Sequence, residues 1–185
     1  MMIARQPENS TQSSYYSASV EGYASIFNTP DQNGDIIAPG AFQSSLQTRA
    51  PIRMLYQHKV ETPIGRWRTL EEDARGLFVR GDLILSSAHA REVFALLEGG
   101  AIDGLSIGFQ TIKATKEPGG RRILKANLWE ISIVTFPMAS SARITHLGTP
   151  QKTSVPVGER SLRPTTSSEG LMAATLREAS TVLTK

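Results

Sequence analysis

The sequence predicts a mainly β fold, an antiparallel or mixed β-barrel with peripheral α-helices. Short runs rich in Val, Ile, Thr and aromatic residues recur between Gly, Pro, Asn and Asp residues, which is typical of strands joined by turns. Only one long segment has clear helical periodicity. Strands do not alternate with helices as they would in a parallel sheet built of βαβ units.

A strand, a turn and a short helix are predicted in succession near the start of the chain. Residues 15–27 alternate polar and apolar side chains, which favours a strand. The Asn-Gly pair at 33–34 tolerates positive φ and predicts a turn. Within residues 40–49, Phe42 and Leu46 lie four positions apart, on one face of a short helix.

Three more strands and the clearest helix follow. Residues 52–58 read as a buried strand that carries His58 at its end, and residues 63–70 and 76–85 are expected to pair with each other. In residues 87–98 apolar side chains follow the i, i+3, i+4, i+7 pattern, which predicts a helix that ends before two glycines.

The last predicted strands, residues 105–114 and 121–135, flank a Pro-Gly-Gly hairpin turn. The predicted organisation is a disordered arm over residues 1–14, the barrel domain over 15–145, and a flexible tail over 146–185. Pro, Ser and Thr become frequent in this tail, and only weak helical spacing follows near its end.

Composition excludes several kinds of chemistry. The chain of 185 residues has no cysteine, so disulfides, thiol nucleophiles and thiolate metal sites are excluded. Its histidines lack the spacing of a helical zinc motif, and we expect neither a metal nor another cofactor. Without a long apolar run or a secretory signal, a soluble intracellular protein with no membrane contact is expected.

Positive charge is concentrated in residues 111–145, although the net charge is only +3. This segment could steer an acidic partner, or it could be the solvated face of a hairpin. Aromatic residues are not interleaved with its basic pair, Arg121 and Arg122, so direct nucleic-acid binding is not expected.

Ser106, between two glycines, is the candidate nucleophile. Residues 104–108 match the G-x-S-x-G pattern of a nucleophile elbow, but that elbow needs a strand before the serine and a helix after it. Here the predicted helix comes first and a strand follows. The elbow interpretation therefore fails on context, and a serine beside glycine is in isolation more often part of a plain turn.

His58 and Glu130 complete the candidate site. A serine hydroxyl is a poor nucleophile unless an imidazole accepts its proton, and a third group must then hold the imidazole in the right tautomer. Glu130 lies in the apolar strand-like run 128–134, where a carboxylate without a partner would be costly to bury. His58 could instead be structural. Glu130 could instead form a salt bridge with Arg121, Arg122 or another basic residue. Asp103 and Asp82 are weaker candidates for the acid of the site.

Together these strings resemble the phage prohead protease family of the HK97 type, which is related to herpesvirus assemblins. The similarity runs over roughly residues 20–145, and the order of its strings makes it specific. The strings are 21–28, 31, 34–35, 39–42, 55–58, 63–66, 76–77, 100–101, 104–109 and 130–137.

The resemblance implies an assemblin-like barrel and a serine endopeptidase, with Ser106 as nucleophile and His58 as general base. Assemblin-like enzymes use a second histidine as the third member, whereas this chain offers Glu130 in the corresponding region. The family parallel also points to an arginine-bearing loop for oxyanion stabilisation, for which Arg143 is the candidate.

The resemblance also implies a biological role. The enzyme would act inside the viral procapsid, in the cytoplasm of the bacterial host, and would cleave the major capsid protein, the scaffold protein and itself. Homo-oligomerisation is compatible with this role. Residues 146–185 would be a self-removed or scaffold-tethering segment, or an ordinary disordered terminus.

Two other functions are compatible with the sequence. In the first, the chain is a catalytically inactive capsid-assembly protein that keeps the barrel and binds scaffold, although the presence of both His58 and Ser106 argues against it. In the second, it is an esterase that uses Ser106, Glu130 and His146 in that order, although the βαβ pattern of such enzymes is absent.

Overall fold

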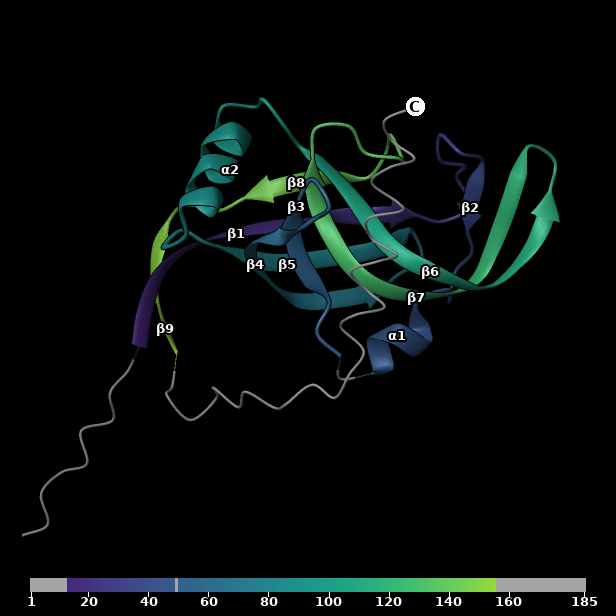
Figure 1. The fold of residues 1–185 in the computed structure, drawn as a ribbon, viewed down its shortest axis with the longest axis horizontal. Coiled ribbons are helices and arrows are strands. Elements are labelled where there is room, and N and C mark those ends of the chain that lie inside the picture. The colour runs from purple at the N-terminus through teal and green to yellow at the C-terminus, as the bar shows by residue number, and fades with distance from the viewer. Residues whose placement is uncertain (1–12, 49, 156–185) are drawn as a thin grey trace, which may run out of the picture.

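The computed structural model describes residues 13–48 and 50–155 of the protein, which form nine strands and two helices (Figure 1). The strands are β1 (Ser13–Ile26), β2 (Asp35–Ile37), β3 (Arg53–Tyr56), β4 (Lys59–Glu72), β5 (Gly76–Ile84), β6 (Gly104–Glu117), β7 (Gly120–Val134), β8 (Arg143–Leu147) and β9 (Gln151–Val155). The helices are α1 (Gln43–Gln47) and α2 (Ala88–Glu98). The prediction of a mainly β structure with few helices is confirmed.

All of these strands belong to one mixed sheet whose pairings close on themselves. The order β7-β3-β4-β5-β1-β8-β6 returns to β7 because β6 also pairs with β7. Neighbouring strands are antiparallel, except that β2 and β3 both run parallel to β7. The strand β7 therefore has three partners, and it is the point at which distant parts of the chain meet.

The core is a single cluster of apolar side chains from the strands and from α2. Leu83 of β5 is fully buried between β1 and β4, where it is in register with Ala18 and Gly65. The helix α1 is attached to β7 by Ser45, whose hydroxyl donates to the Ala126 carbonyl at 3.0 Å and accepts the Leu128 N–H at 2.9 Å. The outer part of the β6–β7 hairpin projects beyond this body (Figure 1).

Most predicted elements are present with shifted ends. The helix expected over residues 87–98 is α2, and the short helix expected over residues 40–49 is reduced to α1. The strands β1, β4, β5, β6 and β7 occupy the predicted segments, with β4, β6 and β7 longer at one or both ends. The three-residue strand β2 was not predicted, because it is too short to show a pattern.

The prediction that His58 ends a strand is wrong, because β3 stops at Tyr56. Gln57 and His58 form a two-residue turn into β4, with φ angles of 54° and 58°. Two central residues with positive φ match a type I′ hairpin turn, whose twist suits the flanking strands. Neither residue is the usual Asn or Gly, so the sequence carried no signal for this turn.

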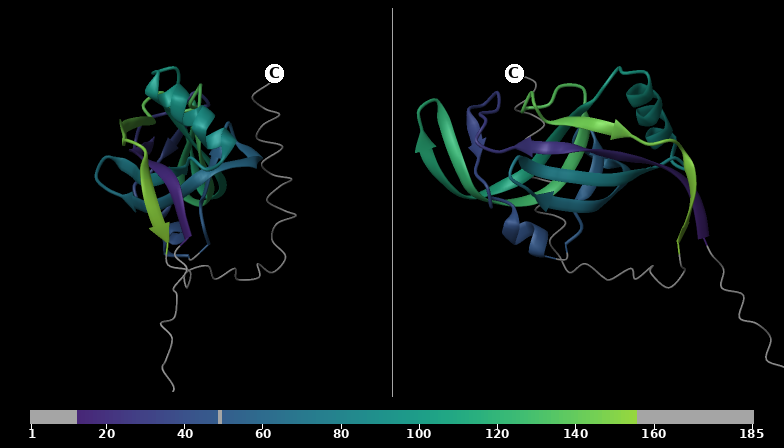
Figure 2. Two further views of the ribbon diagram at one scale, coloured as in Figure 1. Left: turned by 90° about the vertical axis from the view of Figure 1, so that its left-hand side faces the viewer. Right: turned by 180° about the vertical axis from the view of Figure 1, so that it is seen from behind.

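The prediction of a flexible segment from residue 146 is wrong for residues 146–155. The strands β8 and β9 both pair antiparallel with β1, as Figure 2 shows from behind. The 14-residue β1 is long enough to hold β9 near its start and β8 further along. Backbone pairing with β1 stabilises these strands despite their polar composition. The predicted arm up to residue 12 and the tail from residue 156 lie outside the described residues.

Neither α1 nor α2, the helices of the described residues, has the length and apolar character that crossing a membrane requires.

Truncating Leu83 to alanine is expected to lower the free energy of unfolding by about 3 kcal/mol, because it leaves a cavity at a fully buried position between β1 and β4. The matched change Leu96→Ala removes the same atoms from a side chain that is 38% exposed and is expected to cost less than about 1 kcal/mol. Urea unfolding of both variants measures the difference. Equal costs would contradict the described core.

Candidate active site

The side chain of His58, in the turn after β3, contacts the buried carboxylate of Glu130 on β7. The Nδ1 atom of His58 lies 2.8 Å from Oε1 of Glu130, and Glu130 is only 1% exposed. The two residues are brought together by the parallel pairing of β3 with β7, which puts Tyr56 in register with Ile133. The turn that follows Tyr56 therefore lies against the last residues of β7.

Ser132 contacts both partners of this pair. Its hydroxyl donates to Oε2 of Glu130 at 2.6 Å and accepts the backbone N–H of His58 at 3.1 Å. Both oxygens of the Glu130 carboxylate are thus hydrogen-bonded, which offsets much of the cost of burying it. The expectation that this carboxylate needs a partner agrees with the geometry.

Ser106 lies on the other side of β7, in the antiparallel strand β6. It is in register with Ser132, and Gly108 is in register with Glu130. Directly opposed residues of antiparallel strands, and residues two apart along one strand, share a face of the sheet. Ser106, Ser132 and Glu130 therefore lie on one face, with the imidazole of His58 bonded to the last of them.

Ser106 is 4% exposed, and its hydroxyl forms no hydrogen bond to the His58 imidazole within residues 13–48 and 50–155. In proteins without a bound substrate such contacts are often long, and they tighten only when a substrate is held. The structure thus brings His58 to Glu130 and puts Ser106 on the same face, one strand away.

Gly108 leaves the space that the Glu130 carboxylate occupies. A Cβ atom at this position would overlap Oε1, the oxygen that His58 contacts. The second glycine of the G-x-S-x-G string therefore has a packing role and is not part of a nucleophile elbow. Sequence reasoning missed this role because it depends on the residue across the strand pair.

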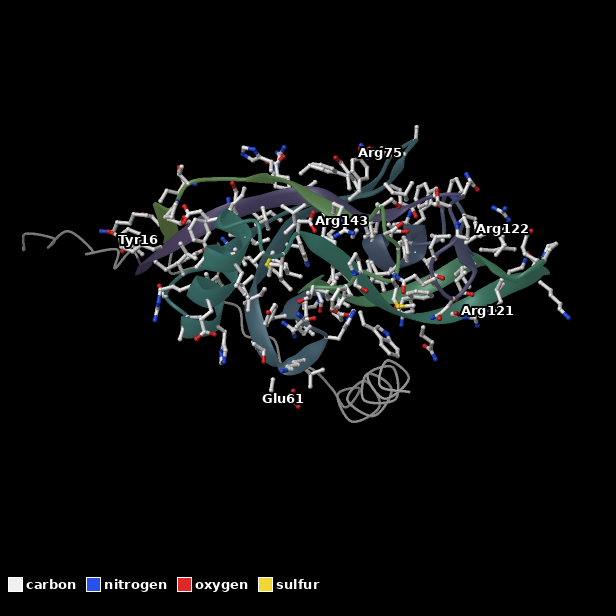
Figure 3. The ribbon with its side chains drawn as sticks, turned by 90° about the horizontal axis from the view of Figure 1, so that it is seen from above. Tyr16, Glu61, Arg75, Arg121, Arg122 and Arg143 are labelled. Atoms are coloured by element: carbon white, nitrogen blue, oxygen red, sulfur yellow. The ribbon has the colours of Figure 1, made fainter. Side chains whose placement is uncertain are left out.

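The arginines that could have paired with Glu130, and the aspartates that could have replaced it as the third member, form ion pairs elsewhere. Arg121 pairs with Asp35 at 2.5 Å, and Arg122 pairs with Glu117 at 2.6 Å. Both arginines lie toward the projecting hairpin, whereas Arg143 lies nearer the middle of the molecule (Figure 3). The remaining candidate acids also have arginine partners, Asp82 with Arg66 and Arg68, and Asp103 with Arg143.

Arg143 begins β8 and is in register with Gly104, two residues before Ser106. Its guanidinium contacts Asp103 at 2.5 Å and donates to the Ser140 carbonyl at 2.9 Å. These contacts hold the arginine beside the strand that carries Ser106. Its assignment to the oxyanion stays a prediction.

His146, the histidine of the esterase alternative, is an exposed residue of β8 in register with Glu21. Both oxygens of Glu130 are instead occupied by His58 and Ser132. The geometry therefore favours His58 as the histidine partner of Glu130.

Two groups near β2, Asp31 in the turn before it and Arg121 on the paired strand β7, have shifted pKa values, but both lie away from this site. Burial raises the pKa of Asp31, whose carboxylate accepts the N–H groups of Asn33 and Asp35. The hydrogen bonds to Asp35 raise the pKa of Arg121. In the part of the chain that the structure describes, no three His, Asp or Glu side chains are grouped so that they could hold a metal ion.

Comparison with known proteins identifies two similar sequences from phages. The chain is 44% identical over 130 residues to the prohead protease of Enterobacteria phage HK97, and this match covers 67% of the chain and 57% of that protein. It is 30% identical over 125 residues to the capsid polyprotein of Pseudomonas phage PAJU2, covering 63% of the chain and 18% of the polyprotein. The chain thus spans 57% and 18% of the lengths of these two relatives.

Two solved structures share the fold at low sequence identity. The bacteriophage T4 capsid assembly protease superposes with a TM-score of 0.51 at 14% identity, over 64% of this chain and 82% of that one. The KSHV protease in complex with a hexapeptide phosphonate inhibitor gives a TM-score of 0.50 at 14% identity, over 89% and 77%. The fold is therefore similar to that of a herpesvirus protease, as the resemblance implied.

The family model described as caudovirus prohead serine protease matches residues 5–155, which include every strand and helix described above. The chain therefore belongs to the caudovirus prohead serine protease family.

Proposed function

We propose that the chain is a serine endopeptidase in which Ser106 is the nucleophile, His58 the general base and Glu130 the group that orients the imidazole. The observation that carries this proposal is the 2.8 Å contact between His58 Nδ1 and the buried carboxylate of Glu130, on the face that also bears Ser106. The cyclic pairing of the strands supports the further proposal of an assemblin-like barrel.

The chemistry follows from this arrangement. With Nδ1–H donating to Glu130, Nε2 of His58 is left as the acceptor for the Ser106 proton. The Ser106 oxygen then attacks the peptide carbonyl, and the imidazolium gives its proton to the leaving amine. Water attacks the acyl-enzyme by the same route and regenerates Ser106. The negative charge of Glu130 stabilises the imidazolium that forms in each half of the reaction.

The oxyanion of each tetrahedral intermediate needs donors, and each is worth roughly 3–4 kcal/mol. We assign this role to the segment that carries Arg143, because it pairs with β6 two residues from Ser106. No metal or other cofactor takes part in the proposed reaction.

We propose that the substrates are the major capsid protein and the scaffold protein, and that the enzyme also cleaves itself. The names of the similar phage proteins, a prohead protease and a capsid polyprotein, support this role. The place of action would be the interior of the procapsid in the bacterial cytoplasm. Because β8 and β9 belong to the sheet, a removable or scaffold-tethering segment would begin after residue 155 and not at residue 146.

Replacing Ser106 with alanine is expected to abolish processing of the capsid protein, because the nucleophile is lost and the other hydroxyl on this face, that of Ser132, is bonded to His58 and Glu130. Mass spectrometry of the chain co-expressed with its capsid protein measures the processing. The exposed serine variant Ser86→Ala is the control and is expected to process normally. Normal cleavage by Ser106→Ala would end the proposal.

Replacing His58 with alanine is expected to slow labelling of Ser106 by a fluorophosphonate by roughly 10³-fold or more, because the hydroxyl loses its base. His146→Ala serves as the control, since His146 lies exposed on β8. A time course of labelling, quenched at intervals and read by intact-mass analysis, gives the labelling rates. A large loss in His146→Ala with none in His58→Ala would instead support the esterase.

Glu130→Gln is also expected to slow labelling of Ser106, but its rate should stay roughly a hundredfold above that of His58→Ala. Glutamine keeps the shape of the side chain but not its charge. The same labelling assay measures this variant. If Glu130→Gln labels as fast as the unaltered protein, Glu130 is not the third member of the site.

A further inference from the structure

Ser132 joins two parts of the candidate site that are 72 residues apart in the chain, His58 and Glu130. It is fully buried, at 0% exposure, so bulk water does not compete for its hydroxyl. The backbone N–H of His58 can only donate, and therefore the Ser132 oxygen must accept it. The single hydroxyl proton is then free to go to Oε2 of Glu130, so both hydrogen bonds have a defined direction.

The first of these bonds holds the turn that carries the imidazole. His58 and Gln57 both have positive φ, a conformation uncommon for residues other than glycine, and it persists only where surrounding contacts hold it. The N–H of Gln57 donates to the Ile133 carbonyl at 3.0 Å, and the next N–H, that of His58, donates to Ser132. Two successive N–H groups thus attach the turn to β7.

The second bond sets the plane of the carboxylate. The terminal torsion of a glutamate is broad, so one hydrogen bond alone leaves the carboxylate free to rotate. The Ser132 hydroxyl holds Oε2, which leaves Oε1 facing His58 Nδ1. Gly108 provides the room for this orientation, because a side chain there would overlap Oε1.

We propose that Ser132 is a positioning residue of the active site, which acts through His58 and Glu130 and does not touch the substrate. The proposal rests on the proposed function of Ser106, His58 and Glu130. It goes beyond that function because it assigns a role to a residue outside the predicted catalytic set. A change at Ser132 would leave the three reacting groups in place but poorly aligned.

The test is the variant Ser132→Ala, measured in two ways on the full chain. Fluorophosphonate labelling of Ser106 is expected to slow roughly tenfold to a hundredfold, since a misplacement of about 1 Å costs that much. The low-field proton NMR resonance of the His58 Nδ1–H is expected to weaken or disappear, a change that a purely structural role would not produce. An unchanged labelling rate with the resonance retained would overturn the proposal.

Ser45→Ala is the matched control, because Ser45 is also a buried serine that accepts one backbone N–H and donates one hydrogen bond. It touches none of the three reacting residues and is expected to keep both the labelling rate and the resonance. If Ser45→Ala slows labelling as much as Ser132→Ala, loss of stability explains the effect and the proposal is wrong.

Ser132→Thr keeps the hydroxyl and decides the question should the alanine variant not fold. It is expected to label within about threefold of the unaltered protein and to retain the resonance; labelling as slow as that of Glu130→Gln would overturn the proposal. Failure of the proposed function is separately visible, because it would leave Ser106 unlabelled in the unaltered protein. The NMR resonance reports on the positioning of His58 even then.

Discussion

The candidate active site depends on one buried carboxylate, that of Glu130. Its burial to 1% exposure would be strongly unfavourable without partners, and the chain supplies two, His58 at 2.8 Å and Ser132 at 2.6 Å. The same contacts that make the burial tolerable also fix the imidazole. Stability and proposed chemistry are therefore served by one set of hydrogen bonds, and a loss of either partner affects both.

The topology of the sheet explains why these groups meet. The strand β7 pairs with β3 on one side and β6 on the other, so a residue of β7 can contact the turn after β3 while it faces β6. The β3–β4 turn brings His58 to Glu130, and the register of β6 puts Ser106 beside Ser132. Neighbouring strands thus carry groups that lie far apart in the sequence.

The sequence was informative wherever one segment alone decides the structure. The apolar spacing of residues 87–98 predicted α2, and the lone carboxylate in an apolar strand predicted that Glu130 needs a partner. The sequence was uninformative where contacts with a distant segment determine the structure. The strands β8 and β9 form because β1 pairs with them, and the roles of Ser132 and Gly108 appear only once the register of β3, β6 and β7 is known.

The most direct measurement is a crystal structure of the protein after reaction with a fluorophosphonate. We expect phosphorus bonded to the Ser106 oxygen, Nε2 of His58 within hydrogen-bonding distance of the adduct, and Nδ1 still on Glu130. A phosphorus atom bonded to another residue, or a His58 ring turned away from the Ser106 adduct, would show that these three residues do not form the active site.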